Sequence, residues 1–115
     1  MNEVEGVNIR FSVQFLRRLK DLAKRYRQIQ NDIQPVIDEL AIGNFLGDQV
    51  KGTGYIILKV RARNRDIPTG KSGGYRLIYQ VLSPRSVSLL LVYAKSEQAD
   101  VSVEEVIAAI EKGLR

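Results

Sequence analysis

Residues 75–94 read Tyr-Arg-Leu-Ile-Tyr-Gln-Val-Leu-Ser-Pro-Arg-Ser-Val-Ser-Leu-Leu-Leu-Val-Tyr-Ala, which predicts two strands joined by a tight turn. Ser83-Pro84-Arg85-Ser86 is typical of a hairpin turn between strands at about 75–82 and 87–94. Residues 87–93 are almost wholly apolar, as is typical of a strand that is covered on both faces. The second strand of the hairpin is therefore expected at the centre of a sheet.

The strand predicted before this hairpin has one basic face. Its side chains alternate, with Ile56, Leu58, Val60 and Ala62 on one face and Lys59, Arg61 and Arg63 on the other, within residues 55–63. Like charges at every second position repel one another, and a polyanion would relieve that repulsion. The pattern favours a face that binds phosphate backbones, and an ordinary solvated face is the alternative.

The long connection at residues 64–74 carries further groups that can bind an anion. Gly70-Lys71-Ser72 looks like the end of a nucleotide-binding loop, but Arg65 stands where that motif needs a glycine. The segment that follows is a strand and not the required helix, so ATP binding is excluded. Gly73 and Gly74 let the backbone approach a ligand closely and offer it N–H groups.

Arg76 lies at the start of the next strand. A guanidinium is a planar, permanently charged group that fits phosphate, so Arg76 is a candidate phosphate clamp; an arginine held by a carboxylate is the alternative. Lys95 follows the last strand on the same side as Tyr93, where it either lines a site or is an ordinary surface lysine. Tyr75 and Tyr79 alternate to the opposite face, and we expect them in the core.

Helical periodicity dominates the first part of the chain. A short strand at residues 7–11 precedes Ser12, a candidate N-cap. Apolar side chains then recur at spacings of three and four, at Phe15, Leu19, Leu22, Tyr26, Ile29 and Ile33. A second helix is predicted to start at Asn31 or Asp32, with Pro35 in its first turn, and to end near Gly43. Residues 44–54 are predicted to form a loop.

A last helix is predicted after Ser102, because Ser102-Val-Glu-Glu has a capping serine followed by early acids. The predicted order is therefore β-α-α-β-β-β-α, an α+β fold. The helical hairpin is expected to cover one sheet face, and the last helix to share the other face with the basic residues. Lys59, Arg61 and Arg76 should then line a groove.

Composition limits the possible chemistry. The chain has 115 residues, a formal net charge of +5 and a pI near 9.7, which indicates one domain (1–115) and an acidic partner. It contains no cysteine and no histidine, which excludes thiolate chemistry and makes a zinc site untenable. No compact acidic cluster indicates a magnesium site, so we expect neither metal nor cofactor. Without a membrane-spanning run or a signal peptide, a cytoplasmic location is expected.

Three segments carry a family resemblance, namely Arg10-Phe-Ser-Val-Gln-Phe-Leu-Arg-Arg-Leu-Lys-Asp-Leu22, Gly70-Lys-Ser-Gly-Gly-Tyr-Arg-Leu-Ile-Tyr79 and Leu91-Val-Tyr-Ala-Lys-Ser-Glu-Gln-Ala-Asp-Val-Ser102. Together they resemble the RelE/ParE superfamily of toxins from type II toxin–antitoxin systems, and most closely its HigB-like branch. The resemblance implies the RelE-like fold, with a curved and mainly antiparallel sheet. It also implies a metal-independent mRNA endonuclease that acts on the ribosome, inhibits translation and is bound by a cognate antitoxin.

The resemblance also implies roles for particular residues. Arg76 matches the arginine that stabilises the transition-state phosphorane. Lys95 matches the basic residue at the end of the last strand, and Lys59 and Arg61 match the basic strand. The expected RNA contacts are Arg63, Arg65, Lys71, Ser72, Gly73 and Gly74.

One departure from the family keeps other functions open. RelE members have a tyrosine in or near the last helix that takes part in proton transfer, and no tyrosine follows Tyr93 here. The groups that transfer protons are therefore unassigned. A ParE-like, non-enzymatic toxin that inhibits DNA gyrase is one alternative, and a non-catalytic RNA-binding protein is another.

Overall fold

The computed structural model describes residues 6–67 and 73–113. Its elements are β1 (Asn8–Phe11), α1 (Val13–Ala23), α2 (Ile29–Ala41), β2 (Asp48–Gln49), β3 (Ile57–Ala62), β4 (Tyr75–Ser83), β5 (Ser86–Ala94) and α3 (Val103–Gly113). The strands form one sheet in the order β1-β5-β4-β3-β2, in which β1 runs parallel to β5 and the other pairs are antiparallel. This confirms the predicted α+β fold and is consistent with a RelE-like fold.

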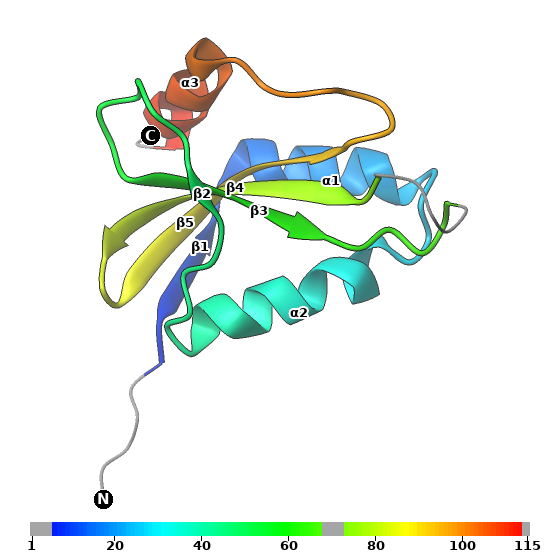
Figure 1. Ribbon diagram of the computed structural model, residues 1–115, viewed down its shortest axis with the longest axis horizontal. Coiled ribbons are helices and arrows are strands. Elements are labelled where there is room, and N and C mark those ends of the chain that lie inside the picture. The colour runs from blue at the N-terminus through cyan, green and yellow to red at the C-terminus, as the bar shows by residue number, and fades with distance from the viewer. Residues whose placement is uncertain (1–5, 68–72, 114–115) are drawn as a thin grey trace, which may run out of the picture.

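Strand β5 is an interior strand, paired with β1 and β4, and both of its faces are apolar. Val87 and Leu89 pack in a core cluster with side chains of α1 and α2, while Leu91 and Tyr93 pack in a second cluster with side chains of α3. Figure 1 shows α2 and α3 on opposite sides of the sheet. The expected covering of one face by the helical hairpin and of the other by the last helix is confirmed.

A β-bulge in β5 ties the sheet to the first helix. Ile78 and Tyr79 pair with Leu91 and Leu89, so that Leu90 is an extra residue between them. The carbonyl oxygen of Leu90 accepts a hydrogen bond from the Ser12 hydroxyl at 2.9 Å. Ser12 also caps α1, as predicted. One buried serine therefore anchors the start of α1 on the bulge.

The second helix begins earlier than predicted. It starts at Ile29, so the predicted start at Asn31 or Asp32 is wrong. The N-cap residue Gln28 makes no capping bond with its own side chain. Its N–H group instead donates to the carboxylate of Asp66 at 2.8 Å. Because Asp66 comes from the connection after β3, no local pattern could reveal this start.

Pro35 lies inside α2, not in its first turn as predicted. A proline has no N–H group, so one internal hydrogen bond of the helix is missing there. The apolar side of α2 nevertheless packs against the sheet, with Ile33, Val36 and Leu40 all buried. This burial holds the helix together across the proline.

Residues 44–54 are not only a loop, as predicted, because they include β2. Asp48 and Gln49 pair with Lys59 and Leu58 at the edge of the sheet. Two residues are too few for side-chain alternation to indicate a strand.

Other predicted boundaries are confirmed. Ser83 pairs with Ser86 across the hairpin turn. Gly43 follows the end of α2 with φ 92°, a left-handed conformation that favours glycine. The Ser102 hydroxyl accepts from the N–H of Glu105 at 3.0 Å, while the Glu105 carboxylate accepts from the N–H of Ser102 at 3.1 Å. Together these two bonds form a capping box at the start of α3.

Replacement of Ser12 by alanine should destabilise the fold more than replacement of Ser102. Ser12→Ala removes both a helix cap and the bond to the bulge, and it should cost about 2 kcal/mol of unfolding free energy. Ser102→Ala removes a cap at an exposed helix and should cost about 1 kcal/mol. Denaturant unfolding of both variants checks this, and equal losses would contradict the role given to the bulge.

Candidate functional site

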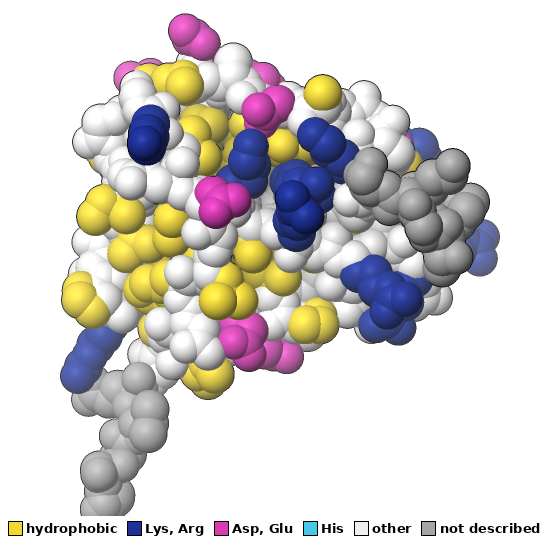
Figure 2. Space-filling view, in the orientation of Figure 1, with side chains coloured by type: hydrophobic (Ala, Val, Ile, Leu, Met, Phe, Trp, Pro, Cys, Tyr) yellow, Lys and Arg dark blue, Asp and Glu magenta, His cyan; other side chains and the backbone are white. Residues whose placement is uncertain are grey.

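The candidate site is a row of side chains across three strands on the α3 side of the sheet. Arg61 on β3 lies opposite Arg76 on β4, and Arg76 lies opposite Tyr93 on β5. Directly opposed residues share a sheet face, so the two arginine side chains extend from neighbouring positions on it. Figure 2 shows Lys and Arg side chains gathered on one face of the molecule. The fold therefore places two like charges at neighbouring positions, and the predicted groove between them stays a prediction.

Backbone carbonyls hold Arg76. Its Nη1 donates to the carbonyl oxygens of Gly73 at 3.1 Å and Tyr75 at 3.3 Å. Within residues 6–67 and 73–113, neither Arg76 nor Arg61 has an ion pair with a carboxylate. A carbonyl fixes a guanidinium without neutralising its charge. Both arginines therefore keep their full positive charge for a ligand.

Gly74 allows the backbone to pass close to β3 just before β4 begins. Its φ is 82°, and a Cβ atom there would clash with the carbonyl oxygen of Ala62 on β3. A glycine is thus required where the connection enters β4, next to Arg76. Gly73 and Gly74 were predicted as ligand contacts; in the structure they shape the backbone that holds Arg76.

Lys59, on the same sheet face, forms an ion pair with Asp100. Its ammonium donates to Asp100 Oδ1 at 3.1 Å, and the Tyr93 hydroxyl and the Val101 N–H donate to the same oxygen at 3.3 and 2.8 Å. The hydrogen bond from the Val101 N–H lowers the pKa of Asp100, and the hydrogen bond from Lys59 lowers it further by a smaller amount. Burial raises the pKa of Tyr93 to about 12, and the negative charge of Asp100 is the second and smaller cause of this rise.

Sequence reasoning singled out neither Tyr93 nor Asp100 as a site residue. Alternation did place Tyr93 on the same side of its strand as the candidate Lys95, and this signal could have identified it. Asp100 lies in the irregular segment between β5 and α3, where no periodicity predicts the direction of a side chain.

The remaining candidates in the described residues have other partners or lie beyond the end of β3. The Lys95 N–H donates to the carbonyl of Gly74 at 2.9 Å, but its ammonium turns to the carbonyl of Ala99 at 2.7 Å. Arg63 is exposed just beyond the end of β3. Arg65 forms an ion pair at 2.8 Å with the buried Asp32 of α2. Lys71 and Ser72 lie outside the described residues.

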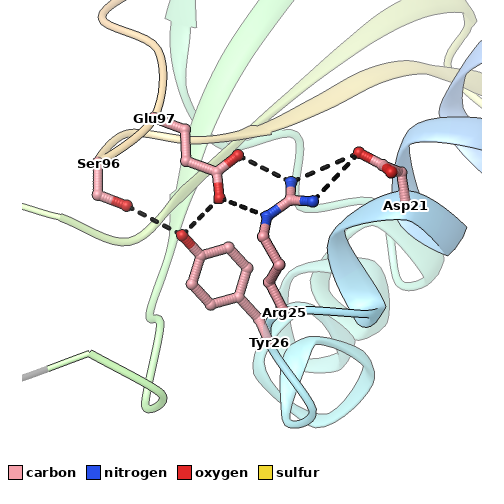
Figure 3. Close-up of polar contacts among 5 residues, drawn as sticks. All are labelled: Asp21, Arg25, Tyr26, Ser96 and Glu97. Carbon is pink, nitrogen blue, oxygen red and sulfur yellow. Dashed lines mark hydrogen bonds and ion pairs between the residues drawn. The ribbon is translucent and has the colours of Figure 1, made fainter.

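A second polar network anchors the segment that carries Lys95 and Asp100 (Figure 3). The Glu97 carboxylate accepts two hydrogen bonds from Arg25, each at 2.8 Å, and one from the Tyr26 hydroxyl at 2.7 Å. Asp21, one turn earlier, pairs with the same guanidinium at 3.4 Å. The turn after α1 therefore holds the segment that carries Lys95 and Asp100 through Glu97, from the side away from the basic face.

The described ranges, 6–67 and 73–113, contain no group of three or more Asp, Glu, His or Cys side chains that could hold a metal ion. In the same ranges, no helix is long and apolar enough to cross a membrane.

Comparison with known families identifies one match. The model of the family described as "ParE toxin of type II toxin-antitoxin system, parDE" matches residues 9–108. This range contains the candidate site residues Lys59, Arg61, Arg76, Tyr93, Lys95 and Asp100. No curated protein matches the chain.

The carboxyl of Glu97 should titrate below its ordinary pKa of 4.5, because Arg25 donates two hydrogen bonds to its ionised form. A group with a lowered folded pKa stabilises the fold above its unfolded pKa, and this contribution disappears as the pH falls through the folded value. Arg25→Gln should therefore move the Glu97 pKa back towards 4.5. The variant should also lose the stabilisation that Glu97 gives to the wild-type fold above its unfolded pKa. Carboxyl NMR titration measures the pKa.

Arg17→Gln is the matched control, since Arg17 is an exposed arginine of α1, the helix that precedes Arg25. An unchanged Glu97 titration in Arg25→Gln, or an equal shift in the control, would contradict the assigned anchor.

Proposed function

The chain belongs to the ParE toxin family of type II toxin–antitoxin systems, and we propose that its toxic activity is cleavage of mRNA on the ribosome. In this proposal the protein is a metal-independent endoribonuclease that resembles the RelE and HigB-like toxins and inhibits translation in the cytoplasm. The alternative is inhibition of DNA gyrase without any chemistry.

The single observation that carries the proposal is the opposed pair Arg61 and Arg76. Two arginines at opposed positions on one sheet face, without carboxylate partners in the described residues, repel each other, and a bound phosphate relieves that repulsion. Arg76 is half-buried and fixed by carbonyl groups, so it loses little freedom when it binds. A fixed cation of this kind favours a phosphate whose negative charge grows during reaction.

The proposed reaction needs only RNA. The ribose 2′-oxygen attacks the adjacent phosphorus, the bond from phosphorus to the 5′-oxygen breaks, and a 2′,3′-cyclic phosphate forms. The 2′-hydroxyl gives up one proton and the leaving 5′-oxygen gains one, so atoms and charge balance. Arg76 and Arg61 would stabilise the additional charge on the phosphorane, and Lys59 would donate to one of its oxygens.

Tyr93 takes a limited part in this chemistry. With a pKa of about 12, its phenol keeps its proton at neutral pH and serves as a hydrogen-bond donor, not as a base. Lys95, whose ammonium lies on the carbonyl of Ala99, would need to turn towards the groove to contact RNA.

The family implies a cognate antitoxin as partner. We propose that an acidic antitoxin segment covers the basic face, because opposite charges are complementary and the arginines then lose their access to RNA. The ribosome and mRNA are the remaining partners in this proposal.

One observation favours the gyrase alternative. The matching family is described as ParE, and in the described residues the basic face presents no histidine or neutral base that could take the 2′ proton. A toxin that only binds gyrase needs no such base.

Arg76→Ala should lower mRNA cleavage by at least about 100-fold, because a fixed charge-stabilising donor is lost. The measurement is mapping of cleaved mRNA ends in a reconstituted translation reaction. Arg10→Ala is the control, since Arg10 is exposed on β1 at the other edge of the sheet. Thermal unfolding of both variants shows whether they are folded.

Full cleavage by folded Arg76→Ala would remove Arg76 from the mechanism. A wild-type protein that arrests gyrase supercoiling and leaves mRNA intact would instead select the alternative function.

A further inference from the structure

Three hydrogen-bond donors converge on one oxygen at the basic face. They are Lys59 Nζ at 3.1 Å, the Tyr93 hydroxyl at 3.3 Å and the Val101 N–H at 2.8 Å, and all point at Asp100 Oδ1. We propose that this oxygen marks the position of an RNA phosphate oxygen, and that Asp100 occupies the phosphate site until RNA displaces it. This inference rests on the proposed function and specifies its phosphate site.

The position matches the rest of the row. Tyr93 lies opposite Arg76, which lies opposite Arg61, so an anion beside Tyr93 shares the sheet face of both arginines and lies one strand from Arg76. The Asp100 carboxylate has ion pairs with neither arginine. A tetrahedral phosphate presents more oxygens than a carboxylate, so while one oxygen takes the place of Asp100 Oδ1 the others are free for the cations of the same face.

Asp100 is able to leave. Its side chain is 63% exposed and that of Lys59 is 31% exposed, and ion pairs so open to water are weak. The segment around Asp100 has other anchors, since Lys95 holds the Ala99 carbonyl and Arg25 holds Glu97. The side chain can therefore rotate away while the backbone keeps its place.

The consequence is an internal competitor for RNA. A free RNA strand must replace Asp100 before Lys59 can bind a phosphate, which weakens unselective binding to polyanions by this basic chain. RNA that is already held in place loses less entropy on binding and displaces Asp100 more readily. Asp100 is thus a specificity element, distinct from the groups that stabilise the reaction.

The test measures binding of a single-stranded 2′-O-methyl oligoribonucleotide, which lacks the attacking hydroxyl and cannot be cleaved. Asp100→Asn and Asp100→Ala should bind it several-fold more tightly than the wild type. In the wild type Asp100 keeps the free oligonucleotide from Lys59, whereas in the variants Lys59 contacts one further phosphate, so the slope of log K against log salt should become more negative by about 0.7.

Asp38→Asn is the matched control. It makes the same change in net charge from an exposed position on α2, on the other side of the sheet. It should leave the salt slope unchanged. Thermal unfolding tests the fold of each variant, and Asp100→Asn keeps an acceptor for the Val101 N–H if the alanine variant is unstable.

Weaker binding, an unchanged salt slope, an equal effect of Asp38→Asn, or no binding by any variant would overturn the inference. Ribosomal mRNA cleavage is measured separately. If the Asp100 variants bind more tightly while the wild type cleaves no mRNA, the proposed endonuclease function fails and the phosphate site stands.

Discussion

The burial of both faces of β5 is the constraint on which the rest of the structure depends. A strand of apolar side chains on each face needs a layer of helices on each side of the sheet. The α1–α2 hairpin supplies one layer and α3 the other. Since α3 must return across the sheet, the segment after β5 passes the ends of β3 and β4, and it brings Asp100 to Lys59.

The same constraint explains where positive charge can lie. The α3 helix covers Ile57 and Ile78 on its face of the sheet, and both are fully buried. Further along β3 and β4, beyond this contact, Arg61 is exposed and Arg76 half-buried. The basic row is thus the uncovered continuation of an apolar face. Its charges are tolerated because water reaches them and because carbonyl groups hold Arg76.

The network of Arg25, Tyr26 and Glu97 connects the two layers. It fastens the segment after β5 to the turn after α1, on the side of the sheet that carries the helical hairpin. Arg18 of α1 also pairs with Glu105 of α3 at 3.2 Å. Exposed ion pairs contribute little stability individually, but together they determine where the segment with Lys95 and Asp100 lies. The basic face and its acidic neighbour therefore depend on contacts made behind the sheet.

The sequence by itself determined those features that depend on near neighbours in the chain. Alternation placed Lys59 and Arg61 on one face of their strand, and the caps at Ser12 and Ser102 follow from side-chain chemistry within one helical turn. Only the tertiary structure decided the register that sets Arg61 opposite Arg76. It also decided that α2 starts where Asp66 accepts a hydrogen bond from the Gln28 N–H, and that Arg65 pairs with Asp32. It alone brought Asp100 to Lys59. These contacts join residues far apart in the sequence, and their partners are chosen by packing around β5, which no local pattern contains.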